Sequence, residues 1–121
     1  TRFGELGLRV AGGETRFDPS LLRAREFSSE TRGFRFLDVH GQWQELSVPA
    51  AGLAFTWCQV PIVYRLRSHG RAALTITWQD GATRTLPTPS LPADLSAELF
   101  RRSGRIRQLE LDFPQESLLG T

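Results

Sequence analysis

The sequence contains no lysine, asparagine or methionine, and it has a single cysteine. One cysteine excludes an internal disulfide, so the sequence does not indicate the redox compartment. All 15 basic residues are arginine. Because the missing residue types have AT-rich codons, their joint absence points to a GC-rich genome, which replaces lysine by arginine everywhere. The arginine content is therefore weak evidence for nucleic-acid binding, and the net charge of +2 is small.

Long apolar runs are also missing. No run approaches the roughly 18–20 residues of a membrane span, and no secretory signal pattern is present. We expect membrane contact only through a segment outside this chain. With 121 residues, 40% of them hydrophobic, the chain is long enough to bury a core without disulfides or metals. We expect one β-rich domain over residues 1–121, with an irregular tail from about residue 115.

The most regular stretch runs from Ile62 to Leu86 and consists of three strand-like segments joined by turns at residues 68–70 and 79–81. Apolar residues alternate there, which is typical of strands with one buried face. We expect three-residue loops, each with a left-handed glycine, in a three-stranded meander. This register pairs Leu66 with Ala72, Tyr64 with Leu74, Ile62 with Ile76, and Leu74 with Leu86. One buried face then holds Tyr64, Leu66, Leu74, Ile76 and Leu86, whereas a two-residue loop at 80–81 moves Leu86 to the polar face.

Other segments also indicate strands. They are Phe3–Val10, the hairpin Gly33–Leu46, Leu53–Val60 ended by Pro61, and Arg105–Phe113. Ile106 is out of phase with Leu109, which predicts a bulge near Arg107 and Gln108. In the hairpin two registers stay open. A three-residue loop pairs Leu37 with Trp43 and Phe34 with Leu46, and a four-residue loop pairs Phe36 with Trp43.

Two segments predict short helices. Asp18 before Pro19 is a good helix start, so we expect a helix from Pro19 to about Phe27. A second helix is expected over Asp94–Arg102, with Gly104 just past its end. The fold class is therefore mainly β: an antiparallel β-sandwich or meander with one or two short helices.

The sequence provides little for catalysis. His40, His69 and Cys58 stand at unrelated points of the chain, and no spacing gives Cys58 a histidine base. Asp38 and His40 offer two metal ligands, but no second His or Cys pair stands at ligand spacing. No phosphate loop, nucleophile elbow or dinucleotide fingerprint is present. We expect no enzyme, no catalytic residue, no cofactor and no metal.

The candidate binding surface consists of aromatic and arginine side chains. Trp78 alternates with Leu74 and Ile76, which predicts burial, but Trp43 and Trp57 are open to a binding role beside Gln42, Gln44 and Gln59. Four arginines near the C-terminus form the densest basic group, which is typical of a solvated face or of a phosphate-binding patch. The candidate surface residues are Trp43, Trp57, Arg101, Arg102, Arg105 and Arg107.

Two hairpins carry a family resemblance. The stretch 33–46, GFRFLDVHGQWQEL, resembles the strand–turn–strand signature in the soluble domains of minor pseudopilins of bacterial type II secretion and type IV pilus systems. The stretch 74–86, LTITWQDGATRTL, is similar to a later hairpin of such domains. The resemblance covers about a third of the chain, and the family's hydrophobic N-terminal helix is absent. It implies a periplasmic or extracellular assembly subunit that works through contacts with other protein subunits.

Three hypotheses follow, in this order. The first is a non-catalytic structural or protein-interaction domain of an extracytoplasmic assembly, similar to a pseudopilin. The second is a carbohydrate-binding β-sandwich module of a larger protein, which binds a sugar polymer on exposed coplanar aromatics. The third, an arginine-rich nucleic-acid-binding domain, is the least favoured because the arginines are spread along the chain.

Overall fold

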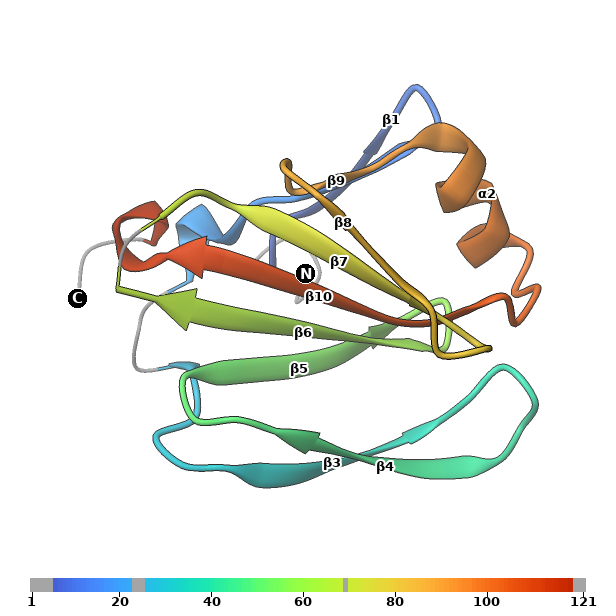
Figure 1. The fold of residues 1–121 in the computed structure, drawn as a ribbon, viewed down its shortest axis with the longest axis horizontal. Coiled ribbons are helices and arrows are strands. Elements are labelled where there is room, and N and C mark those ends of the chain that lie inside the picture. Colours follow the sequence, from blue (N-terminus) through green and yellow to red (C-terminus); the bar gives the residue numbers. More distant parts are fainter. Residues whose placement is uncertain (1–5, 23–25, 69, 119–121) are drawn as a thin grey trace.

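The computed structural model describes residues 6–22, 26–68 and 70–118. It confirms a mainly β fold with antiparallel sheets and a short α-helix (Figure 1). The elements are β1 (Leu8–Ala11), β2 (Glu14–Phe17), a 3-10 turn (Pro19–Leu21), β3 (Arg32–Leu37), β4 (Trp43–Val48), β5 (Gly52–Trp57), β6 (Val60–Arg67), β7 (Ala73–Trp78), β8 (Thr83–Leu86), β9 (Ser90–Leu91), α2 (Ala93–Phe100), β10 (Ile106–Pro114) and a second 3-10 turn (Gln115–Ser117). The helix expected over Asp94–Arg102 is α2.

The largest sheet has the strand order β5-β6-β10-β7-β8. One pairing of the predicted meander is therefore wrong. β6 and β7 are not neighbours, because β10 lies between them. β10 is parallel to β6 and antiparallel to β7, so Leu111 stands beside both Tyr64 and Leu74. The linker at residues 68–72 has to span two strand spacings, roughly 10 Å, which its five residues reach easily. The alternating apolar residues of β10 match both neighbours, and local hairpin rules do not anticipate such a distant partner.

The loop length predicted at residues 79–81 is confirmed, and the choice left open in the β3–β4 hairpin is decided. Leu74 pairs with Leu86, and Gly81 closes the loop at 79–81 with a left-handed φ of 91°. In the β3–β4 hairpin the first of the two registers is present, with Leu37 opposite Trp43. The bulge predicted at Arg107 is also there, because the pairing of β10 with β7 shifts between Ile106 and Gln108.

Two local predictions are wrong, and one strand was missed. The helix that begins at Pro19 ends at Leu21, because Leu22 has an extended backbone. Asp18 does cap it, and its side chain accepts a hydrogen bond from the Ser20 N–H at 3.0 Å. Residues 23–25 of the expected helix lie outside the described residues. The strand expected up to Val60 turns back at residues 58–59, and Pro61 belongs to β6, where it precedes the residues that pair with β10. β2 was not predicted. Of the first expected strand, Phe3–Val10, residues 3–5 lie outside the described part of the chain, and β1 begins only at Leu8.

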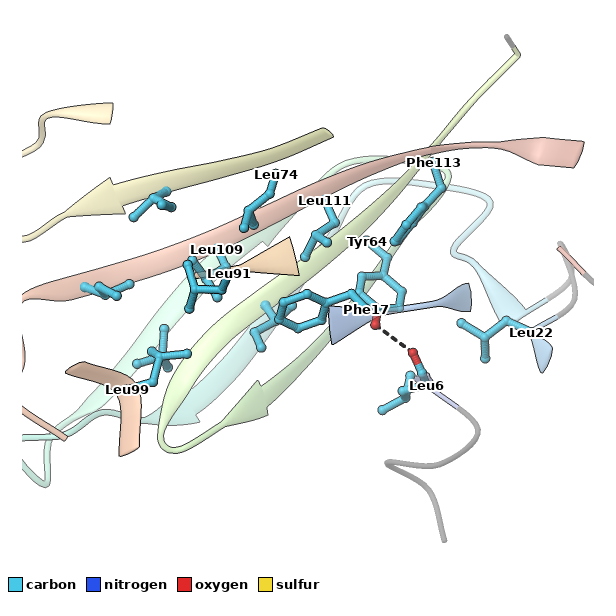
Figure 2. Packing of buried hydrophobic residues seen from close by; sticks show 14 of the residues in the cluster. Leu6, Phe17, Leu22, Tyr64, Leu74, Leu91, Leu99, Leu109, Leu111 and Phe113 are labelled. Atoms are coloured by element: carbon cyan, nitrogen blue, oxygen red, sulfur yellow. Dashed lines mark hydrogen bonds between the residues drawn. The ribbon is translucent and has the colours of Figure 1, made fainter. Parts of the chain in front are cut away.

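The core lies between one face of the five-stranded sheet and a layer made of β1, β2, β9 and α2 (Figure 1). Tyr64 stands in its middle and contacts Phe17, Phe55 and Phe113 edge-on, with ring centroids 5.0–6.3 Å apart. Figure 2 shows its hydroxyl donating a hydrogen bond to the Leu6 carbonyl at 2.6 Å. Burial raises the pKa of this phenol above its ordinary value. Of the predicted buried face, Tyr64, Leu74 and Ile76 are fully buried; Leu66 and Leu86 are half-buried against the core.

Ile76→Ala tests the core directly. Ile76 is fully buried opposite Leu109, so the truncation should lower the free energy of unfolding by about 2–5 kcal/mol in urea denaturation. Val10→Ala is the matched control, because Val10 is 51% exposed on β1 and its loss should cost within about 0.5 kcal/mol. A loss below about 1 kcal/mol for Ile76→Ala would mean that the buried face is assigned wrongly.

Candidate functional site

Four connections meet at one end of the five-stranded sheet, at the right of Figure 1. They are the β3–β4 loop, the β5–β6 turn, the β7–β8 loop and the segment from α2 into β10. Between the hairpin and the sheet lies a cavity of about 270 Å³, to which all four connections or their adjoining strands contribute. We call it the amide cavity because five glutamines line it: Gln42, Gln44, Gln59, Gln79 and Gln108.

The β5–β6 turn holds strained backbone. Both of its residues are left-handed, Cys58 with a φ of 54° and Gln59 with a φ of 63°, although neither is glycine or asparagine. The Gln59 amide nitrogen donates to the Asp38 carbonyl at 3.1 Å, and its oxygen accepts from Arg102 Nε at 3.1 Å. Arg102 is itself left-handed, with a φ of 51°. Two strained residues are thus joined by a side-chain hydrogen bond beside the cavity, and such strain tends to gather at functional sites.

The hairpin tip is fixed by Asp38. Its Oδ1 accepts the backbone N–H groups of His40 and Gln42 at 2.9 Å, and its Oδ2 accepts from the Gln44 amide at 3.0 Å. These bonds, led by the one from Gln42, hold the pKa of the Asp38 carboxyl below its ordinary value. His40 lies against Gly104, where a Cβ would approach the imidazole to 3.3 Å. Asp38 therefore has a structural role, and the loop is packed against the α2–β10 connection.

The bulge in β10 changes which residues face the cavity. With Arg107 as the extra residue, Ile106 and Leu109 both reach the core. Arg107 and its neighbour Gln108 both line the cavity. Bulges commonly re-aim side chains in this way beside binding sites.

The candidate arginines do not form one surface. Arg101 and Arg105 both pair with Glu98, Arg105 at 3.4 Å, while Arg102 contacts Gln59 and Arg107 lines the cavity. The tryptophans also separate. Trp57 is half-buried against the core, as is Trp78, whereas Trp43 is 64% exposed.

Trp43 belongs to the hairpin outer face, which we define as Arg35, Leu37, Trp43 and Glu45. Leu37 stands directly opposite Trp43 and is 40% exposed. The Arg35 guanidinium lies 5.2 Å from the Trp43 ring centroid, within cation–π distance. The outer face is thus an apolar pair with an arginine over the ring, held on a two-stranded ribbon.

The described residues offer few groups suited to catalysis or to metal binding. Cys58 is half-buried against the core, and burial raises the pKa of its thiol, with Arg102 acting in the opposite direction. His69 lies outside the described residues. Within residues 6–22, 26–68 and 70–118, no three His, Cys, Asp or Glu side chains are grouped to hold a metal ion. Over the same residues, no helix has the length and hydropathy needed to cross a membrane.

Comparison with known proteins gives no assignment: neither a protein-family model nor a curated protein matches the sequence.

The sequence analysis set Gln42, Gln44 and Gln59 beside the candidate binding residues Trp43 and Trp57, but it missed Gln79 and Gln108. The apolar pattern did predict the bulge at Arg107. A bulge next to a glutamine was the one signal in the sequence that could have pointed to Gln108 as a site residue. Gln79 joins the cavity because its loop lies beside the start of β10, where the Gln79 N–H donates to the Arg105 carbonyl at 3.0 Å. That pairing depends on where β10 inserts, which the local pattern does not contain.

Arg102→Gly tests the strain at the end of α2. Arg102 occupies the left-handed position after the helix, where glycine is usual, and a left-handed non-glycine residue costs roughly 1–2 kcal/mol. Allowing for the lost bond to Gln59, we expect the variant to be more stable by about 0.5–1 kcal/mol in urea. Arg101→Gly is the control and should destabilise, because Arg101 is helical with a φ of −79°. A larger loss for Arg102→Gly than for Arg101→Gly would contradict the strain.

Glu98 predicts a pH dependence of stability. The Ser103 hydroxyl bonds its carboxylate at 2.7 Å, and with Arg101 and Arg105 it holds the pKa of Glu98 below the ordinary value of 4.5. A lowered folded-state pKa stabilises above the unfolded pKa, and this contribution is lost as the pH falls through the folded value. The stability difference between the wild type and Glu98→Gln should therefore be full at pH 7 and shrink below about pH 4.5.

Urea denaturation between about pH 7 and pH 3 measures this difference, with Glu116→Gln as the matched change at an exposed position. A difference between the wild type and Glu98→Gln that stays constant over this range would show that the ion pairs of Glu98 do not stabilise the fold.

Proposed function

We propose that this chain is a non-catalytic protein-interaction domain and that the hairpin outer face is its contact surface. The setting we propose is an extracytoplasmic assembly of the kind to which minor pseudopilins belong. The observation that carries the proposal is Trp43, 64% exposed, beside Leu37 and beneath Arg35.

The composition of the outer face favours a protein partner. Tryptophan and arginine are the residues most enriched among interface positions that dominate binding energy. Trp43 leaves about 100–150 Å² of its surface in water, and covering it would contribute roughly 3 kcal/mol. Arg35 already packs over the ring, and a contact made before binding reduces the side-chain entropy that is lost when a partner covers the ring.

The position of this face supports the same function. The side chains of Phe36, Gln44 and Leu46 line the cavity on the other side of the ribbon, so the outer face points away from the domain. The sugar-platform alternative is less well supported, because Arg35 already lies over the Trp43 ring and Trp57 packs against the core. The nucleic-acid alternative is less well supported because Glu98 pairs with two of the four arginines.

Site-specific crosslinking tests the proposal. The photoreactive residue p-benzoylphenylalanine replaces Trp43 in the natural full-length gene product, and the producing cells are irradiated. We expect one discrete adduct with another protein, identified by mass spectrometry, because the benzoyl group stands where the partner covers the indole.

Arg84 provides the control position, because it is exposed on the edge strand β8, at the far side of the five-stranded sheet from β5. The same probe at Arg84 should give no such adduct. Equal adducts from both positions, or none from position 43, would contradict the proposal. An adduct that glycosidase digestion removes would contradict it as well and would favour the carbohydrate alternative.

A further inference from the structure

We propose that the amide cavity binds a sugar residue of a glycan, a ligand of hexose size that is recognised through its hydroxyl groups. This site is separate from the hairpin outer face, on the opposite side of the β3–β4 ribbon.

Two departures from regular backbone and one loop contact supply part of the lining of this cavity. The left-handed turn places Gln59 between the hairpin tip and Arg102. The bulge puts both Arg107 and Gln108 on the cavity. The β7–β8 loop brings Gln79 to the cavity through its backbone bond to the Arg105 carbonyl. Since the left-handed turn and the bulge each weaken local structure and both lie at one cavity, we infer that the cavity has a function of its own.

Unused hydrogen-bonding groups face this cavity. Among the described residues, the side chains of Gln42, Gln79 and Arg107 have no hydrogen-bond or ion-pair partner. Gln44 and Gln108 each donate one bond, to Asp38 and to Glu110, and their amide oxygens remain open as acceptors. Gln59 donates one bond to the Asp38 carbonyl and accepts one from Arg102, and it holds the loops together. The cavity therefore offers both donors and acceptors from several directions.

This chemistry fits hydroxyl groups better than a phosphate. Each hydroxyl donates one hydrogen bond and accepts others, which matches an amide that offers both groups. A phosphate needs several cationic donors, whereas Arg107 is the only arginine among the described residues of the lining, which also contains the carboxylate residue Asp38. Phe36 and Leu46 supply an apolar wall for the C–H face of a sugar ring. About 270 Å³ is close to the lower limit of small-ligand sites, which suits one sugar residue.

The test titrates the folded chain with four named probes: cellohexaose, maltohexaose, chitohexaose and a hexamer of galacturonic acid. Side-chain amide resonances in ¹⁵N-correlated NMR spectra report the binding site and confirm that each variant is folded. We expect at least one probe to shift the glutamine amides of the cavity below about 10 mM. Gln79→Ala and Arg107→Ala should each weaken that probe by about fivefold to tenfold, since each removes a hydrogen bond.

Gln115→Ala is the matched control, because Gln115 is exposed in the C-terminal 3-10 turn and does not line the amide cavity. Its affinity should stay within about twofold of the wild type. If none of the four probes shifts the cavity amides, the proposal is overturned. It is equally overturned if Gln115→Ala weakens binding as much as Gln79→Ala does.

Discussion

The structure depends on the insertion of β10 between β6 and β7. One row of side chains on β10, Leu109, Leu111 and Phe113, completes the buried face to which both neighbours contribute. On the opposite face Arg65 of β6 bonds Asp112 at 2.8 Å and Glu110 at 3.0 Å, so the same pairing also gains charge-assisted contacts. Without β10, β6 and β7 would each lack a partner along one edge, and unpaired backbone groups there are costly. The last strand among the described residues, β10, therefore fixes the sheet that the earlier strands leave open.

The insertion also explains where the candidate sites lie. The start of β10 follows α2 and lies beside both the β7–β8 loop and the tip of the β3–β4 hairpin. It therefore brings the four connections together at one end of the sheet. Regular geometry fails at that end in three ways: the left-handed pair at 58–59, the left-handed Arg102 and the bulge at Arg107. Elsewhere the described left-handed residues are glycines, apart from Ala51. Folding alone does not require left-handed residues other than glycine to gather beside one cavity. A function of the cavity explains their position better.

Much of the local structure could be predicted from the sequence, because it depends on residues that are close together in the chain. The alternation in β7 and β10, the glycine at 81 and the out-of-phase Ile106 are short-range signals, and each led to the correct strand, loop or bulge. The partner of β6 was mispredicted because a nearby hairpin and a distant parallel strand offer the same apolar pattern. The candidate site fared less well. Gln79 and Gln108 are ordinary polar residues until β10 brings them to one cavity, and the dispersal of the four arginines follows from the position of Glu98.

The β3–β4 hairpin connects the two proposed surfaces energetically. It forms its own two-stranded sheet, and among the described strands no ladder pairs it with β5 or β6. Its position therefore rests on side-chain contacts, such as the bond from Gln59 to the Asp38 carbonyl and the burial of Val48. A ligand held between the hairpin and the sheet adds contacts to both, so it favours this position of the hairpin over others. Since the outer face of the same ribbon carries Trp43, the two proposals together imply that a cavity ligand and a protein partner strengthen each other's binding wherever both require the docked hairpin.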